Sequence, residues 1–250
     1  MESLPLPLLA WCGVALTLAG VVKGATGIGI PLVGSSLLTL VLTVPQAVAL
    51  LPVPIIVANV WQSFTGGYLI ATCRRFSMLI LAMLAGTVAG GAMLAYVDLP
   101  ILMGLLGAVV LTFAVLELAR VRLRVPPRHH TLAGSAAGLT GGVLGGMSSI
   151  FGPPIIMFLV SLELTKEEFV GTVSTIYLAS GVILGAVLAG FGVAGTGELA
   201  WSALATLPVF AGMAVGTWAR RHVSEAVFRR GLLVLLVLVG LNLIRRGVAG

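Results

Sequence analysis

Two segments of the chain combine glycine, proline and hydroxyl residues in a way that suits the binding of a small anion. The first contains Lys23, Gly24, Thr26, Gly27, Gly29 and Pro31. The second contains Gly145, Gly146, Ser148, Ser149, Gly152 and Pro153. Glycine and proline interrupt helices, so we expect the backbone to open at both segments. Hydroxyl groups and the amides of a helix that restarts after the break could then donate hydrogen bonds to anion oxygens.

Lys23 has the clearest chemistry of these residues. It is one of two lysines, and it stands among apolar and glycine residues, away from the arginine clusters. A charge inside hydrocarbon is costly, so it usually has a partner or a purpose. An anionic substrate would be such a partner, and a lysine that reaches the headgroups from a helix end is the alternative. We expect Asn59 to reach the same site, or else to hydrogen-bond between helices.

Other kinds of chemistry have no support in the sequence. The acidic residues fall near predicted helix ends or in loops, so no carboxylate is expected at mid-depth, where cation transporters commonly use one. Nucleotide-binding loops, zinc-binding histidine pairs and nucleophile elbows are also missing from the sequence. We therefore expect no enzyme, no catalytic residue, no cofactor and no metal site.

The composition is that of a membrane protein. The chain has 250 residues, of which 59% are hydrophobic and 9% are charged, whereas soluble domains have about 25% charged residues. The net charge of +6 is divided among short clusters between apolar stretches, as in membrane-protein loops, and does not form the basic face of a nucleic-acid-binding protein. The lipid bilayer is the expected partner and nucleic acid is not, while a homodimer is left open.

The apolar stretches divide the chain into two similar halves. Each half has a broken element followed by three ordinary spans, in an internal duplication. We expect a first repeat at 1–119, a cytoplasmic basic linker at 120–130 and a second repeat at 131–250. The expected elements are a broken element at 5–44, spans at 47–67, 76–96 and 99–119, a second broken element at 131–163, and spans at 169–190, 199–219 and 231–246.

The charges of the loops favour opposite orientations for the two halves. A basic loop follows the first ordinary span of the first half but the second span of the second half, and basic loops tend to stay cytoplasmic. Each broken element would then be a re-entrant helix pair that turns near the midplane, although an ordinary span at 5–23 is the alternative. Arg245 and Arg246 would lie outside, against the rule. The expected fold is an all-α membrane protein with two pseudo-symmetric, inverted halves.

The two glycine-rich segments, 20–31 and 138–154, resemble the paired signatures of the sulfite exporter TauE/SafE family. The spacing, the duplication and the size agree, so the resemblance covers nearly the whole chain. It implies a multi-pass permease of the bacterial inner membrane for sulfite or organosulfonates, usually an exporter. The chain departs from the commonest family pattern at Lys23 and at Ile30.

The residues and the resemblance together lead to one functional hypothesis with two rivals. We expect a permease that carries a small anion, sulfite or an organosulfonate, by alternating access at a midplane site between the broken helices. An anion channel would use the same site with both gates open together. A membrane scaffold that transports nothing is the second rival, but buried polar backbone would serve no purpose there.

Overall fold

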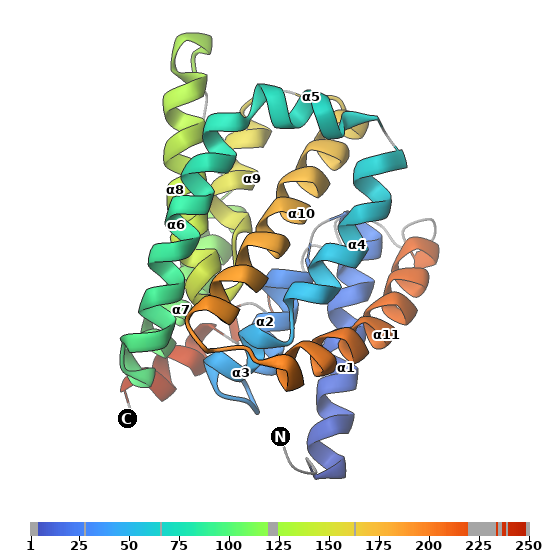
Figure 1. Ribbon diagram of the computed structural model, residues 1–250, viewed down its shortest axis with the longest axis vertical. Coiled ribbons are helices and arrows are strands. Elements are labelled where there is room, and N and C mark those ends of the chain that lie inside the picture. Colours follow the sequence, from blue (N-terminus) through green and yellow to red (C-terminus); the bar gives the residue numbers. More distant parts are fainter. Residues whose placement is uncertain are drawn as a thin grey trace.

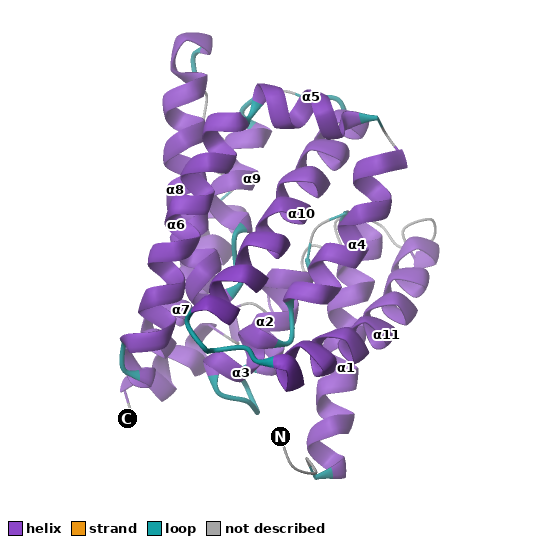
Figure 2. Cartoon of the chain, in the orientation of Figure 1, coloured by secondary structure: helices purple, strands orange, loops and turns teal. Residues whose placement is uncertain are grey.

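The described part of the chain is built from helices. The computed structural model describes residues 5–27, 29–65, 67–119, 125–162, 164–219, 234, 237–238 and 240–248. Short turns join the helices, and these residues contain no strand (Figures 1 and 2). In chain order the helices are α1 (Leu6–Thr26), η1 (Ile30–Gly34), α2 (Ser35–Leu38), α3 (Val44–Ala49), α4 (Pro52–Thr65), α5 (Tyr68–Arg75), α6 (Ser77–Tyr96), α7 (Leu99–Leu118), η2 (Pro127–His129), α8 (His130–Ser148), α9 (Gly152–Val160), α10 (Lys166–Gly190) and α11 (Thr196–Ala219). Residues 240–248 are also helical.

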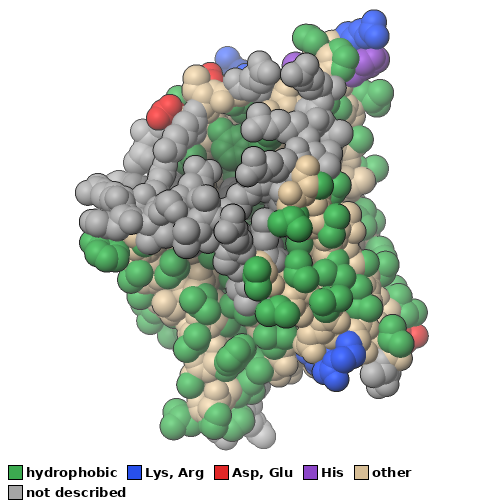
Figure 3. Space-filling model, turned by 180° about the vertical axis from the view of Figure 1, so that it is seen from behind, with side chains coloured by type: hydrophobic (Ala, Val, Ile, Leu, Met, Phe, Trp, Pro, Cys, Tyr) green, Lys and Arg blue, Asp and Glu red, His purple; other side chains and the backbone are tan. Residues whose placement is uncertain are grey.

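Five helices among the described residues are long and apolar enough to cross a membrane, namely α1, α6, α7, α10 and α11. Figure 3 shows hydrophobic side chains over the flank of the molecule, with charged side chains gathered toward its two ends. An apolar flank suits contact with lipid, and charged ends suit the headgroup regions. The prediction of an all-α membrane protein is therefore confirmed.

The first broken element reverses at two glycines. The helix α1 ends where Gly27 adopts a left-handed conformation, with φ of 81°, and donates its N–H to the carbonyl of Lys23. Gly29 follows with φ of 147°, and a side chain here would collide with Val22. Pro31 then lies at the start of η1, which continues into α2. In Figure 1, α1 begins at the N-terminal end of the molecule, and α2 and α3 return toward that end.

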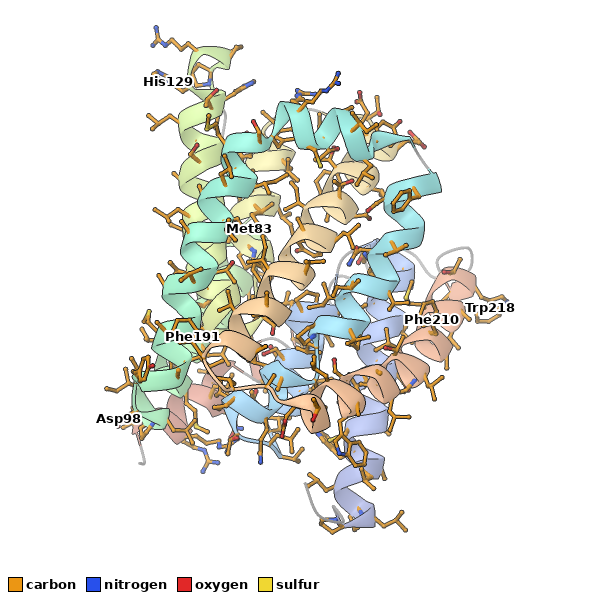
Figure 4. All side chains as sticks on the ribbon, in the orientation of Figure 1. Met83, Asp98, His129, Phe191, Phe210 and Trp218 are labelled. Carbon is orange, nitrogen blue, oxygen red and sulfur yellow. The ribbon has the colours of Figure 1, made fainter. Side chains whose placement is uncertain are left out.

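The second broken element reverses in the same way from the opposite end. The helix α8 begins beside His129 at the far end of the molecule (Figure 4), and α9 returns toward it (Figure 1). The turn is made by Ser149, which has a left-handed φ of 64° and donates its N–H to the carbonyl of Gly145 at 2.6 Å. Ile30 in the first reversal and Ile150 in the second are fully buried, so both turns lie inside the protein. Irregular backbone is tolerated at membrane depth only in such a place.

Both long arms of the broken elements pack on helices from the other half of the chain. The helix α1 lies against α11, and α8 lies against α6. A methyl group added at Gly20 or Gly24 would overlap backbone atoms of α11, and one added at Gly142 or Gly146 would overlap backbone atoms of α6. Such small residues allow membrane helices to approach closely. The two halves are therefore interlocked, because each half holds the broken element of the other.

The helices α4 and α10 form a third contact between the halves. Gly181 of α10 packs against Ile55 and Ile56 of α4, and Gly171 of α10 packs against the side chain of Tyr68 at the start of α5. We call the whole interface between α4 and α10, from the contact at Gly181 to the contact at Gly171, the seam. In Figure 1, α10 runs diagonally through the middle of the molecule and α4 runs alongside it. The helix α4 also contacts η1, and α10 contacts α8 and α9, so the seam lies beside both broken elements.

The observed helices can be set beside the predicted spans. The helices α6, α7, α10 and α11 occupy the stretches expected at 76–96, 99–119, 169–190 and 199–219. The stretch expected at 47–67 is divided, because α3 ends at Ala49 and α4 begins at Pro52, which suits the first turn of a new helix. The span expected at 231–246 lies only partly within the described residues, and residues 120–124 of the expected linker lie outside them.

The helix α1 combines features of both alternatives considered for it. With 21 residues it is long enough for an ordinary span, yet the chain reverses after it as a re-entrant pair would (Figure 1). The returning arm is shorter, because η1 and α2 end at Leu38. The depth of this turn in the bilayer stays a prediction.

Replacing Gly20 with alanine tests the interlocking of α1 and α11. The added methyl group would overlap the carbonyl oxygen of Val209, and overpacking of this kind costs about 1–3 kcal/mol. We expect Gly20→Ala to lower the unfolding temperature of the purified protein in detergent. The control is Gly13→Ala on the same helix, where the new methyl group meets nothing and helix propensity improves. Equal unfolding temperatures for the two variants would contradict the packing.

Candidate functional site

Lys23 lies at the end of α1 with only 1% of its surface exposed. Its ammonium group donates one hydrogen bond to the carbonyl of Gly27 at 2.7 Å and another to Oδ1 of Asn59 at 2.6 Å. The left-handed turn at Gly27 keeps its carbonyl within reach of the ammonium group. The amide of Asn59 is oriented in turn, because its Nδ2 donates to the carbonyl of Ile55 at 2.7 Å. Gly27 and Asn59 thus hold the lysine where the first helix breaks, and Ile55 holds Asn59 in turn.

The partners of Lys23 carry no charge. Among the described residues it is the only charged side chain that is buried, and no acidic side chain joins it there. A buried ammonium group normally needs a negative partner, since uncharged groups replace only part of its hydration. The site therefore has a positive charge that the described side chains do not neutralise.

Ser148 and Ser35 join the two broken elements directly. The hydroxyl of Ser35, at the start of α2, donates to the backbone carbonyl of Ser148 at 2.6 Å. The hydroxyl of Ser148 is used locally, because it donates to the carbonyl of Leu144 at 2.7 Å and accepts the N–H of Ile150 at 3.3 Å. The hydroxyl of Ser148 thus stabilises the second break locally, and the backbone carbonyl of Ser148 binds the returning arm of the first broken element through Ser35.

Three buried hydroxyl groups, those of Ser36, Ser63 and Ser149, have no hydrogen-bond partner among the described residues. All three side chains are at most 1% exposed. An unsatisfied buried hydroxyl costs about 1–3 kcal/mol, so it is uncommon without a ligand, a water molecule or strain to explain it. Ser36 and Ser149 are the direct neighbours of the bonded pair Ser35 and Ser148. The unsatisfied donors therefore lie at the junction of the breaks and on α4.

The helix α10 touches both breaks with one face. Gly27 in the first break lies against the side chain of Val170, and Gly152 after the second break lies against the hydroxyl of Tyr177. Val170 and Tyr177 are seven residues apart, so the two contacts are separated by about 10 Å along the helix axis. Ser174 lies on the same face between them and is fully buried. Both breaks and their polar groups are therefore brought to one side of α10.

Several predicted ligands are accounted for by packing. Gly24 and Gly146 face the backbones of α11 and α6, and Gly145 lies under the ring of Phe151. Thr26 is exposed and donates its hydroxyl to the carbonyl of Val22 at 2.8 Å. These contacts give the four residues structural roles, so a role in binding is not needed to explain them and stays a prediction.

The prolines limit what the backbone can offer to a ligand. Pro31 and Pro153 both lie in the first turn of a returning helix, and both are buried. Pro154 follows directly, so the first turn of α9 lacks two amide hydrogens. The predicted set of bare amides is therefore small, and the main donors at the site are the ammonium group of Lys23 and the serine hydroxyls.

Sequence reasoning missed Ser63. This residue follows Asn59 by one helical turn on α4 and is fully buried with an unpartnered hydroxyl. A lone serine in an apolar helix usually packs between helices, so the sequence holds no signal that could single it out. Among the described residues no group of His, Cys, Asp or Glu could hold a metal ion.

Two substitutions of Ser149 separate backbone strain from the loss of its hydroxyl. A residue other than glycine in the left-handed region is strained, at a cost on the order of 1 kcal/mol. Ser149→Gly and Ser149→Ala both lack the hydroxyl, but only glycine accepts φ of 64° freely. We expect Ser149→Gly to unfold at a higher temperature than Ser149→Ala. The reverse order in a thermal unfolding assay would show that the turn is not strained.

Comparison with known proteins gives one match. No curated protein and no solved structure matches the chain. A family model with the description "Sulfite exporter TauE/SafE" matches residues 12–243, a region that contains both breaks, α4 and α10. The resemblance seen in the glycine-rich segments is thereby confirmed. Since the match covers nearly all of the 250 residues, the chain belongs to the sulfite exporter TauE/SafE family, a family of membrane transporters.

Proposed function

We propose that this protein carries sulfite or an organosulfonate across the membrane and binds it beside Lys23, between the two broken helices. The observation that supports this proposal most is a buried ammonium group whose partners, Gly27 and Asn59, are uncharged. A transporter needs a site that is incomplete without its substrate. An anion beside Lys23 would complete it.

Electrostatics favours an anion of this kind. Two unit charges about 4 Å apart attract each other by roughly 4 kcal/mol at an effective dielectric constant of about 20. Lys23 uses two of its three N–H groups within the protein, which leaves one for a ligand. The unpartnered hydroxyls of Ser36 and Ser149 supply neutral donors that rotate to suit several oxygens. One charge and several neutral donors suit a small oxyanion with three oxygens.

The arrangement of the helices supports alternating access. The two broken elements open toward opposite ends of the molecule (Figure 1), as expected for inverted halves. Each is held against a helix of the other half by glycine contacts, so a movement of one half would displace both breaks. Lys23 and Ser149 are both at most 1% exposed, so neither end has an open path to them. A site closed on both sides favours a carrier over an open channel.

Lys23→Met tests the site directly. Losing a hydrogen bond to a charged group costs about 1.5–3 kcal/mol, so the affinity for methanesulfonate or sulfite should fall by about 10- to 100-fold. Calorimetric titration of the purified protein measures this. Lys23→Arg keeps the charge and should bind better than Lys23→Met.

The matched control is Arg74→Gln, which removes an exposed positive charge of α5 and should leave the affinity nearly unchanged. Unchanged affinity in Lys23→Met, or equal losses in Lys23→Met and Arg74→Gln, would remove Lys23 from the site.

Transport measurements distinguish a carrier from a channel. In proteoliposomes we expect uptake of radiolabelled sulfonate to saturate with concentration and to be accelerated by unlabelled sulfonate inside, because each cycle reorients the same site. Planar-bilayer recording of the same preparation should detect no single-channel current. Discrete currents carried by the anion would favour the channel and contradict alternating access.

A further inference from the structure

We infer that the anion passes between the central site and the end of the molecule that bears Arg74 and Arg75 through the seam of α4 and α10, with the hydroxyl of Ser63 as its first hydrogen-bond donor on the way. This inference rests on the proposed function and adds a route to it. It also gives a purpose to a residue that the site beside Lys23 leaves unexplained.

Ser63 supplies the starting observation. It is fully buried, and its hydroxyl has no partner among the described residues. Asn59 lies one turn earlier on the same face of α4 and binds Lys23. A molecule that leaves Lys23 along this face therefore meets the hydroxyl of Ser63 next.

The register of the seam places hydroxyl groups opposite Ser63. The helices touch at Ile55 and Gly181 near one end, and α5 touches α10 through Tyr68 and Gly171 near the other. Between these contacts lie Asn59 and Ser63 on α4, and the buried residues Thr172, Ser174, Thr175 and Tyr177 on α10.

The seam differs from the other contacts between the halves. Where α1 meets α11 and α8 meets α6, glycines bring backbone against backbone and leave no room for a solute. In the middle of the seam neither helix has a glycine, because α10 has none between Gly171 and Gly181 and α4 has none at all, so no such backbone contact forms there. Small polar side chains with an unsatisfied donor are what a route for an anion requires, because the anion must exchange its water shell for hydrogen bonds.

The outer end of the seam carries exposed charges of both signs. The short helix α5 lies across it (Figure 1), with Arg74 and Arg75 both exposed. Glu167 and Glu168 lie in the first turn of α10 at the same end. The carboxylate of Glu168 accepts the N–H of Thr165 at 3.0 Å and interacts electrostatically with Arg75, which leaves Arg74 as the arginine without such a partner among the described residues. Exposed arginines raise the local concentration of anions. Tyr68 covers Gly171 directly beneath them, so a shift of α5 would uncover the seam.

Cysteine labelling tests this route in the full chain. The two native cysteines, Cys12 and Cys73, are replaced by alanine, and Ser63→Cys is introduced. The probe is the membrane-impermeant reagent 2-sulfonatoethyl methanethiosulfonate, which is itself a sulfonate. Native Cys73 is exposed on α5, so a chain with Cys12→Ala alone shows which membrane face this end occupies. Thr87→Cys is the matched control, because Thr87 is equally buried but lies where α6 meets Gly146 of α8.

We expect the Ser63→Cys protein to react from the same face as Cys73, at least about tenfold faster than the Thr87→Cys protein. Methanesulfonate should slow the reaction, and it is used as the protecting anion because sulfite would consume the reagent. Reaction from the opposite face alone, or no reaction from either face, would overturn the route. If the cysteine-free parent, which retains Lys23, fails to bind methanesulfonate, the proposed function itself is wrong.

A second pair of variants tests the same route if the Ser63→Cys protein does not fold. Ser63→Ala removes the hydroxyl, and Ser63→Thr retains one. We expect Ser63→Ala to lower the transport rate by about tenfold while the affinity for methanesulfonate stays within about twofold, and Ser63→Thr to restore the rate. Full transport by Ser63→Ala would exclude Ser63 from the route, whereas the site beside Lys23 would stand.

Discussion

The interaction on which the structure depends is the burial of the Lys23 ammonium group against uncharged partners. A charge in the interior of a membrane protein must be compensated. Here the compensation is partial, because a carbonyl and a side-chain amide supply dipoles but no charge. The break at Gly27 supplies one of these dipoles, because its carbonyl lies outside any helical hydrogen-bond ladder and accepts from the lysine. The break thus orients an acceptor toward the lysine.

The interlocked halves keep this arrangement in place. Glycine contacts fix α1 on α11 and α8 on α6, and the bond from Ser35 to Ser148 joins the two reversals. The helix α10 then supports both breaks from one side. Close packing of this kind makes each broken element rigid relative to its supporting helix, so a conformational change would move α1 together with α11 and α8 together with α6.

Much of the fold could be read from the sequence, because hydropathy and glycine–proline clusters are strong signals in a membrane protein. The pairing of two breaks, the isolation of Lys23 and its approach to Asn59 follow from residues that are conspicuous in an apolar chain. The roles of Gly24 and Gly146 did not follow, because one glycine can open a backbone or admit a neighbouring helix. Ser63 could not be predicted from the sequence either, because only its surroundings in the structure show that its hydroxyl has no partner among the described residues.

An experimental structure with 2-bromoethanesulfonate would locate the bound anion directly, because bromine gives an anomalous scattering signal. We predict a bromine peak between the two breaks, with a sulfonate oxygen within about 3 Å of the Lys23 ammonium group. Bromine peaks found only beside exposed arginines, with the surroundings of Lys23 empty at saturating ligand, would contradict it.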